Sequence, residues 1–310
     1  MRVLFFDCYS GISGNMILGA LLDLGISEDV FRRELGKLNL PGYGLIIRKV
    51  QKDGIWGTDV TVVTQYGEKH MEEHGVELEK RQECSNCRTY CYDWHSSSTC
   101  CILDIERLIN GSGFRPGIKD FSIRAFREIA RAEAKVRGIS MEDVSFHAAE
   151  AVDSIVHIVG TRICIDLLGI NRVFSSPLCD GKGLVKYCNG MLSIPSPVVA
   201  EMISGSGIPL ITMDINMELV TPTGMSLIKC MASDFGNMPA MIINRVGYGM
   251  GKRETGMPDV LRVVQGDLLE GKIIEGEYGA DEILPLEIID IVDGFPEIPA
   301  YKNLVKSPGL

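Results

Sequence analysis

Apolar and polar positions at the start of the chain follow two different periods. Residues 3–6 are consecutively apolar and β-prone, and small residues at 10–14 interrupt the pattern before a second apolar stretch at 16–24. A short apolar run bounded by turn residues is typical of a buried strand, whereas the longer stretch, which ends at Gly25, is typical of a helix. The pattern predicts a strand, a tight loop and a helix in direct succession, with Asp7 at the carboxyl end of the strand.

Regular periodicity continues as far as residue 264, apart from one long irregular segment, and the acidic tail after residue 270 has only isolated apolar clusters. Apolar spacing predicts helices over residues 27–38, 102–109, 118–137 and 148–168, and strands over residues 45–50, 59–65 and 260–264. Between residues 67 and 101 the sequence is polar and rich in Cys and His, without periodicity, as in functional or linker segments. We therefore expect an α+β fold, in which helices cover a mixed sheet, with a long irregular Cys/His-containing insertion.

The same pattern divides the chain into four segments. The 310 residues suffice for two domains, or for one domain with an insertion. The expected segments are an amino-terminal strand, loop, helix and strands (1–66), the Cys/His-rich insertion or linker (67–101), a helical and mixed α/β portion that packs with the first (102–270), and a divergent acidic tail (271–310).

Composition and charge narrow the class of protein. The chain is 45% hydrophobic and 23% charged, with a formal net charge of −10, which is typical of a globular protein and disfavours nucleic acids and anionic membranes as partners. Met1 and Arg2 lead directly into the first strand, so we expect no signal peptide and a cytoplasmic location. Charged residues interrupt the apolar stretch 151–170, which argues against a membrane span. In a reducing compartment the ten cysteines indicate thiols or metal ligands rather than disulfides.

The loop after the first strand carries the first candidate chemistry. Gly11 and Gly14 allow tight turns and close approach of a ligand, and the amino end of the following helix points its N–H groups at the loop. With Asp7, Ser10 and Ser13 beside them, these groups suit a phosphate or its divalent cation. The loop matches neither of the common glycine-rich nucleotide motifs. An ordinary tight strand-to-helix connection with a capping serine explains the same residues.

The irregular insertion holds a second candidate, a set of soft metal ligands. Cys84 and Cys87 form a CxxC pair, with Cys91 and His95 a few residues further on. This spacing is typical of metal ligands, although a matching second pair, as in a zinc ribbon, is missing. The alternative is a poorly ordered loop with exposed thiols.

A third candidate lies on one face of the helix predicted over residues 148–168. Glu150, Asp153 and His157 fall on the same face at 100° per residue, and His147 lies a turn away at the amino end. Imidazole with carboxylate suits nickel, zinc or iron. A solvated or salt-bridged polar face is the alternative.

Two further segments are suited to anions. Thr221 and Thr223 flank a proline at a predicted helix start, where free N–H groups and hydroxyls meet. Lys252 and Arg253 follow the glycines of residues 247–251, a glycine-rich loop in which two cations would recognise phosphate or carboxylate. An ordinary basic turn is the alternative.

Five segments in the same order resemble the LarC family of nickel insertion proteins. They are FDCYSGISGNM (6–16), AVDSIVHIVG (151–160), SSPL (175–178), ELVTPTG (218–224) and GYGMGKRETGMPDVLRV (247–263), so the resemblance spans about residues 1–268. It implies CTP-dependent nickel insertion into pyridinium-3,5-bisthiocarboxylic acid mononucleotide, with two Ni–S bonds and one Ni–C bond, for the maturation of lactate racemase. The implied cofactors are nickel and CTP with Mn or Mg. The implied partners are the mononucleotide, a complementing carboxy-terminal chain and lactate racemase, and the sequence also admits a homo-oligomer.

Under this resemblance the candidate residues take roles. Asp7, Ser10, Ser13 and Asp153 would be catalytic; Gly11, Gly14, Thr221, Thr223, Lys252 and Arg253 would bind the cofactor; Cys84, Cys87, Cys91, His95, His147, Glu150 and His157 would bind metal. Rival interpretations are a nickel carrier or scaffold without independent catalysis, a metal-dependent phosphohydrolase, and an inactive homologue.

The chain departs from the family pattern at several positions. Asn15 replaces an aspartate, Ala148 replaces a glutamate and His157 replaces another acid. The insertion is cysteine-rich where the family is histidine-rich, and its serine and threonine run at 96–99 is what histidine codons give in a shifted reading frame. The tail after residue 271 does not resemble the family's carboxy-terminal domain.

Overall fold

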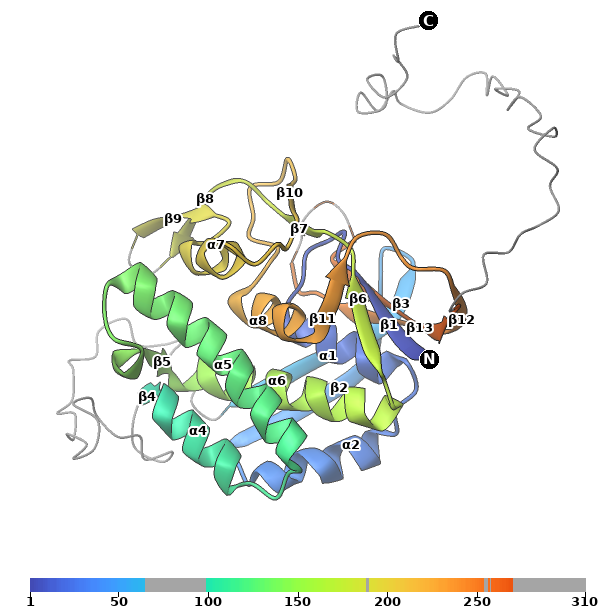
Figure 1. The fold of residues 1–310 in the computed structure, drawn as a ribbon, viewed down its shortest axis with the longest axis horizontal. Helices are drawn as coiled ribbons and strands as arrows, with labels where there is room; N and C mark the ends of the chain where they lie inside the picture. Colours follow the sequence, from blue (N-terminus) through green and yellow to red (C-terminus); the bar gives the residue numbers. More distant parts are fainter. Residues whose placement is uncertain (65–98, 188–189, 254–255, 257, 270–310) are drawn as a thin grey trace, which may run out of the picture. The chain divides into compact units, whose positions relative to one another are not determined.

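A mixed seven-stranded sheet forms the centre of the fold (Figure 1). The computed structural model describes residues 1–64, 99–187, 190–253, 256 and 258–269. The strand order is β11-β6-β1-β13-β12-β3-β2. The strands are β1 (Arg2–Asp7), β2 (Tyr43–Lys52), β3 (Ile55–Thr64), β6 (Arg172–Ser175), β11 (Ala232–Phe235), β12 (Met241–Met250) and β13 (Val260–Leu268). The α+β class and the mixed sheet are therefore confirmed.

The first strand, β1, lies between a parallel and an antiparallel neighbour. Val3 pairs with Arg172 of β6 in the parallel sense, and Asp7 pairs with Arg262 of β13 in the antiparallel sense. The interior residues of β1 are buried on both faces of the sheet, which explains why the strand reads as a continuous apolar run instead of an alternating one. The predicted strand, loop and helix succession is confirmed.

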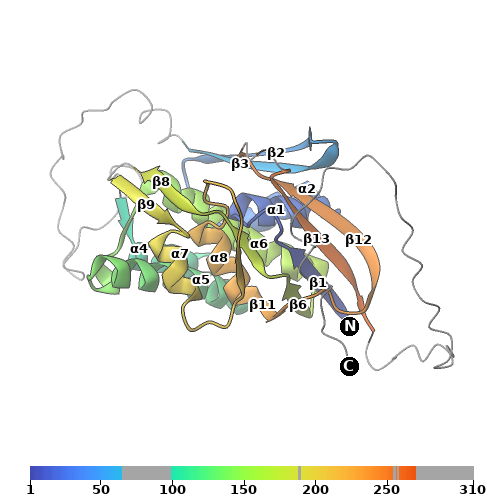
Figure 2. The ribbon, with the colours of Figure 1, turned by 90° about the horizontal axis from the view of Figure 1, so that it is seen from above.

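Helices cover one face of the central strands (Figure 2). They are α1 (Gly14–Asp23), α2 (Glu28–Leu35), α4 (Ile102–Gly111), α5 (Pro116–Arg137), α6 (Ala148–Leu168), α7 (Pro197–Ile203) and α8 (Pro222–Met231). The helices predicted over 102–109, 118–137 and 148–168 are confirmed. The helix predicted over 27–38 ends earlier, because the chain tightens into a 3₁₀ turn at Gly36–Leu38.

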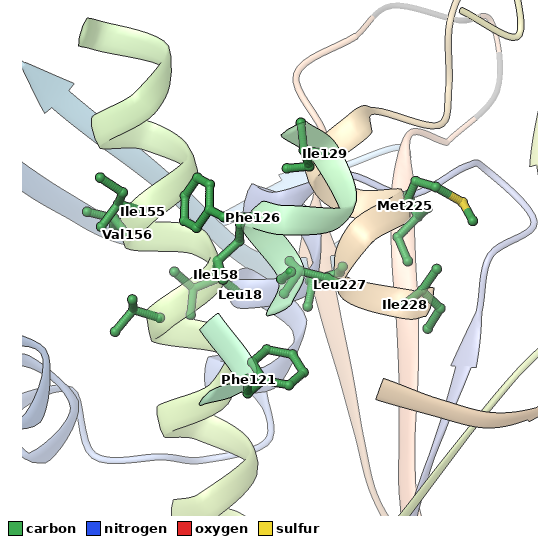
Figure 3. Close-up of a cluster of buried hydrophobic side chains, with 14 of the residues drawn as sticks. Leu18, Phe121, Phe126, Ile129, Ile155, Val156, Ile158, Met225, Leu227 and Ile228 are labelled. Carbon is green, nitrogen blue, oxygen red and sulfur yellow. The ribbon is translucent and has the colours of Figure 1, made fainter. Parts of the chain in front are cut away.

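The main core lies between these helices and the sheet. Leu18 of α1, Phe126 of α5, Ile155 of α6 and Leu227 of α8 are among its buried side chains, drawn in Figure 3. A second, smaller cluster that includes Val3 and Phe5 occupies the opposite face of the sheet. The sheet therefore has a helix-covered face and an open face.

Glycines let α1 lie directly on the sheet. A Cβ on Gly249 would lie 1.8 Å from the Met16 carbonyl oxygen, and one on Gly247 would lie 2.2 Å from the Ala20 carbonyl oxygen. We expected these two glycines in a flexible loop over residues 247–251, and that expectation is wrong, because both lie inside β12. Their missing side chains provide close packing, a role that glycine also has inside strands.

The remaining strands form three small two-stranded sheets. They pair β4 (Thr99–Cys101) with β5 (Ser145–His147), β7 (Leu178–Asp180) with β10 (Leu210–Thr212), and β8 (Gly183–Tyr187) with β9 (Gly190–Ile194). We expected an irregular insertion up to residue 101, but Thr99–Cys101 is a strand because it hydrogen-bonds to β5. Residues 65–98 and 270–310 lie outside the described residues. None of the helices in the described part of the chain is long and apolar enough to cross a membrane.

Candidate functional site

Three loops meet at the amino end of α1. We call their meeting point the three-loop junction; the loops are residues 8–13, residues 217–223, and the connection from β12 to β13, of which residues 251–253 and 258–259 take part. The Ile12 N–H donates to the Leu219 carbonyl oxygen at 3.0 Å, and the Thr221 N–H donates to the Ile12 carbonyl oxygen at 3.0 Å. The Ser10 hydroxyl donates to the Pro258 carbonyl oxygen at 2.7 Å. The predicted loop, helix start and basic segment are therefore neighbours in space.

The two loop glycines are required by packing within the junction. Gly11 has φ +84°, and a Cβ there would lie 2.4 Å from the Leu219 carbonyl oxygen. A Cβ on Gly14 would lie 2.9 Å from both His157 Cβ and Thr223 Cγ2. Gly14 thus brings the amino ends of α1 and α8 together against α6. Ligand contact by these glycines stays a prediction.

The serines of the first loop use their hydroxyl protons within the protein. Ser13 is the N-cap residue of α1, but its hydroxyl donates to Asn15 Oδ1 at 2.8 Å and does not cap the helix. Asn15 in turn donates from Nδ2 to the Met250 carbonyl oxygen at 3.1 Å. The first turn of α1 therefore has no side-chain cap from Ser13, and such a turn attracts anions.

Arg253 is fixed at the junction by a buried carboxylate. Its backbone N–H donates to Asp259 Oδ2 at 2.8 Å, and its Nη1 donates to the Leu219 carbonyl oxygen at 3.1 Å. Asp259 is fully buried. Lys252 points elsewhere and donates to Thr61 Oγ1 at 2.9 Å. Of the two predicted cations, Arg253 directs its side chain to the second loop of the junction, whereas Lys252 directs its side chain away to β3.

Asp180, which the sequence analysis missed, supports the second loop. Its Oδ1 accepts hydrogen bonds from the N–H groups of Leu219 at 2.7 Å, Gly181 at 2.8 Å and Val220 at 3.2 Å. Burial raises the pKa of this carboxyl, although the three N–H groups oppose that shift. Asp180 therefore acts as a tether for the segment that holds Ile12 and Arg253.

The predicted metal-binding face of α6 is only partly assembled. His157 is 3% exposed, and its Nδ1 lies 3.1 Å from Asp153 Oδ2. Its Nε2 has no hydrogen-bond partner among the described residues. His147 and Glu150 are exposed at the start of the helix. Within the described ranges, no group of three or more His, Cys, Asp or Glu side chains could hold a metal ion.

The start of α8 contributes two threonines. The Thr221 hydroxyl caps the helix by accepting from the Gly224 N–H at 3.1 Å. The Thr223 hydroxyl lies 3.0 Å from that of Ser154 on α6. The predicted insertion ligands Cys84, Cys87, Cys91 and His95 lie outside the described residues.

Asp7 lies apart from the other predicted catalytic residues. Its carboxylate forms an ion pair with Arg262, and both line a cavity of about 390 Å³ on the open face of the sheet. Ser10 and Ser13 lie in the junction, and Asp153 lies on α6 beneath it. The structure therefore separates Asp7 from Ser10 and Ser13, which we expected to hold one phosphate or its cation together.

The family model and the curated relatives that match this chain all point to one protein family. A family model described as nickel insertion protein matches residues 4–301, which extends beyond residue 268, where our sequence resemblance ends. Three curated relatives are named pyridinium-3,5-bisthiocarboxylic acid mononucleotide nickel insertion protein. They come from Acetivibrio thermocellus (45% identical, covering 97% of this chain and 68% of the relative), Lactiplantibacillus plantarum (38%, covering 93% and 67%) and Desulfitobacterium hafniense strain DCB-2 (35%, covering 97% and 67%). No solved structure matches the chain.

Proposed function

The chain belongs to the nickel insertion protein family, and from this premise we propose that it inserts nickel into pyridinium-3,5-bisthiocarboxylic acid mononucleotide. In this proposal it is a cytoplasmic nickel insertase of nickel-pincer cofactor synthesis, and the product matures lactate racemase. Nickel and the mononucleotide are substrates, and CTP with Mn²⁺ or Mg²⁺ is the co-substrate that the resemblance implies.

The observation that carries the proposal is the position of Arg253 beside the amino end of α1. One oxygen, the Leu219 carbonyl, accepts hydrogen bonds from both the Arg253 guanidinium and the Ile12 N–H. The N-cap residue of α1, Ser13, does not cap the helix with its side chain. A fixed guanidinium next to such a helix start is suited to bind a phosphate group. We propose that this junction binds the phosphate of the mononucleotide.

His157 is our candidate for the nickel contact within the described residues. Asp153 accepts from Nδ1 and so fixes the tautomer that leaves the Nε2 lone pair free, as carboxylate partners do for metal-binding imidazoles. A buried Nε2 without a partner costs about 1–3 kcal/mol unless an ion or donor meets it. Cys84, Cys87, Cys91 and His95 remain proposed as ligands that capture nickel for transfer.

The described residues do not by themselves account for the co-substrate. A nucleoside triphosphate with Mn²⁺ or Mg²⁺ needs oxygen ligands for the cation, and the described ranges hold no group of three or more suitable acidic or imidazole side chains. Whether turnover needs the complementing carboxy-terminal chain is part of the test.

The experiment mixes purified protein with nickel, CTP, Mg²⁺ and the nickel-free mononucleotide, with and without the complementing chain. We expect nickelated product by mass spectrometry, and its absence from both mixtures would contradict the insertase proposal. Arg253→Ala should weaken mononucleotide binding about 10- to 100-fold, the value of one or two lost charge-assisted hydrogen bonds. Arg33→Ala, which removes an exposed arginine from α2, is the matched control and should bind as the parent does.

The same mixtures separate the rivals. A carrier or scaffold would bind nickel stoichiometrically without consuming CTP, and a phosphohydrolase would cleave small phosphoesters without nickel. Equilibrium dialysis of a variant with Ser at positions 84, 87 and 91 tests the insertion, since unchanged nickel stoichiometry would mean that those thiols are not ligands. His157→Gln should lower the nickel stoichiometry further if Nε2 is a ligand.

A further inference from the structure

A cavity on the open face of the sheet is not used by the phosphate site. It has a volume of about 390 Å³ and lies over β1, β12 and β13. We call it the open-face cavity, and its lining residues include Phe5, Asp7, Met238, Ile243, Arg262 and Val264. Its lining combines charged and large apolar side chains around a space large enough for a small aromatic molecule.

The polar side of the cavity is an ion pair with spare hydrogen-bonding capacity. Arg262 donates to Asp7 Oδ2 from Nε at 3.0 Å and from Nη2. Asp7 is 17% exposed and Arg262 is 48% exposed in their side chains. Both donors go to one oxygen, so Arg262 Nη1 and the second carboxylate oxygen of Asp7 take no part in the pair. The pair can therefore meet a ligand that carries both an anionic and a cationic group.

The apolar side of the cavity combines a buried floor with an exposed rim. Phe5 and Val264 are buried in one apolar cluster, and they are paired neighbours on the adjacent strands β1 and β13. Met238 and Ile243 are 42% and 49% exposed, which is unusual for large apolar side chains that gather around one cavity. Such a lining is typical of a site that buries the face of a flat ring.

The cavity adjoins the three-loop junction along the chain on both sides. Asp7 immediately precedes the first loop, and Arg262 follows closely after Asp259, which fixes Arg253. The paired ends of β1 and β13 therefore join the phosphate region to the cavity. A ligand with a phosphate at one end and a ring at the other could contact both.

We propose that the open-face cavity binds the pyridinium ring of the substrate, with a ring thiocarboxylate on Arg262 and the positive ring nitrogen on the side of Asp7. This inference rests on the proposed function and adds a ring subsite to it. The ring face lies on Phe5 and Val264, and Met238 and Ile243 close over it. The zwitterionic ring and the zwitterionic residue pair are electrostatically complementary.

The test uses nicotinic acid mononucleotide, a pyridinium mononucleotide with one ring carboxylate, and ribose 5-phosphate, which has no ring. Titration calorimetry of the full chain measures both. We expect Arg262→Lys, which keeps the charge and loses the planar fork, to weaken nicotinic acid mononucleotide binding about tenfold. Ile243→Ala should weaken it about threefold. Ile46→Ala, an equally exposed isoleucine on β2, is the matched control and should have no effect.

The outcomes distinguish this inference from the phosphate proposal. Ribose 5-phosphate binding should be lost in Arg253→Ala and kept in Arg262→Lys. Unchanged nicotinic acid mononucleotide binding in both cavity variants, or no binding of that probe by the parent protein, would overturn the ring subsite. Loss in the cavity variants with no effect of Arg253→Ala would keep the ring subsite and overturn the phosphate site.

A second measurement needs no variant. With ¹³C-labelled methionine methyl groups, the Met238 signal should shift when nicotinic acid mononucleotide is added, while that of the buried Met202 on α7 should stay in place. A stationary Met238 signal at saturating probe would also refute the ring subsite.

Discussion

A methyl group at Gly249 tests whether the contact between α1 and β12 holds the candidate site in place. A Cβ at Gly249 would lie 1.8 Å from the Met16 carbonyl oxygen. Carbon and oxygen in van der Waals contact are separated by about 3.3 Å, so α1 or β12 must shift by roughly 1.5 Å. The struck atom belongs to the backbone, so no side-chain rotation can relieve the overlap.

The cost follows from the packing on either side of the contact. Overpacking a core costs about 1–3 kcal/mol, and the rigid backbone contact favours the upper value. Each kcal/mol of lost stability lowers Tm by roughly 2–4 °C in a domain of about this size, so a loss of about 3 kcal/mol in Gly249→Ala should lower Tm by about 6–12 °C. Because α1 begins in the three-loop junction, phosphate-ligand affinity should fall as well.

Thermal unfolding followed by circular dichroism measures this difference. Gly117→Ala is the control, since a Cβ there has nothing within 4 Å and lies in the first turn of α5. Alanine is more favourable than glycine in a helix by up to about 1 kcal/mol, so the Tm of Gly117→Ala should equal or exceed that of the parent. A Gly249→Ala protein with the Tm of the parent would refute the reasoning, because it would mean that the contact between α1 and β12 leaves space for a methyl group.

Three further predictions follow from single contacts. Thr221→Ala should destabilise the protein by about 1 kcal/mol in urea unfolding, since the Gly224 N–H loses its cap. Burial raises the pKa of Glu128, but its basic neighbours, Lys229 foremost, outweigh burial and hold it below the usual value. A carboxyl with a depressed pKa stabilises the fold at pH values above its unfolded pKa, and this stabilisation is lost as the pH falls. Glu128→Gln should therefore lower the free energy of unfolding near about pH 7 and change it little near about pH 3. Equal losses at both pH values would contradict this. Burial raises the pKa of the Cys8 thiol to about 12, so iodoacetamide should modify Cys8 only in unfolded protein, as peptide mass spectrometry would detect.

Regular elements with strong periodicity could be predicted from the sequence. The long helix predicted over residues 118–137 is α5, Pro116–Arg137, and the predicted opening strand is β1. Local pattern suffices there because the apolar stripe of each element packs on the core. Gly247 and Gly249 misled the same reasoning, since a glycine that serves close packing cannot be told from one that serves a loop without knowledge of α1.

The junction could be predicted only in part, because its contacts join distant segments. Arg253 and the first loop were found as anion-binding candidates, but Asp259 and Asp180 were not, since their roles depend on loops that meet only in the fold. Helical spacing placed His147 with His157 on one face. Burial separates the two, because His147 precedes the helix in solvent while His157 packs against Gly14.

The position of β1 in the sheet has a consequence for how the protein is made. Strand β1 leaves the ribosome more than 250 residues before its antiparallel neighbour β13, which spans Val260–Leu268. Until that strand emerges, β1 has an unpaired edge, and unpaired edges in nascent chains promote aggregation. We expect the nascent chain to depend on chaperones until β13 docks. Translation pauses between residues 175 and 260 should then lower the soluble yield without changing the stability of the finished protein.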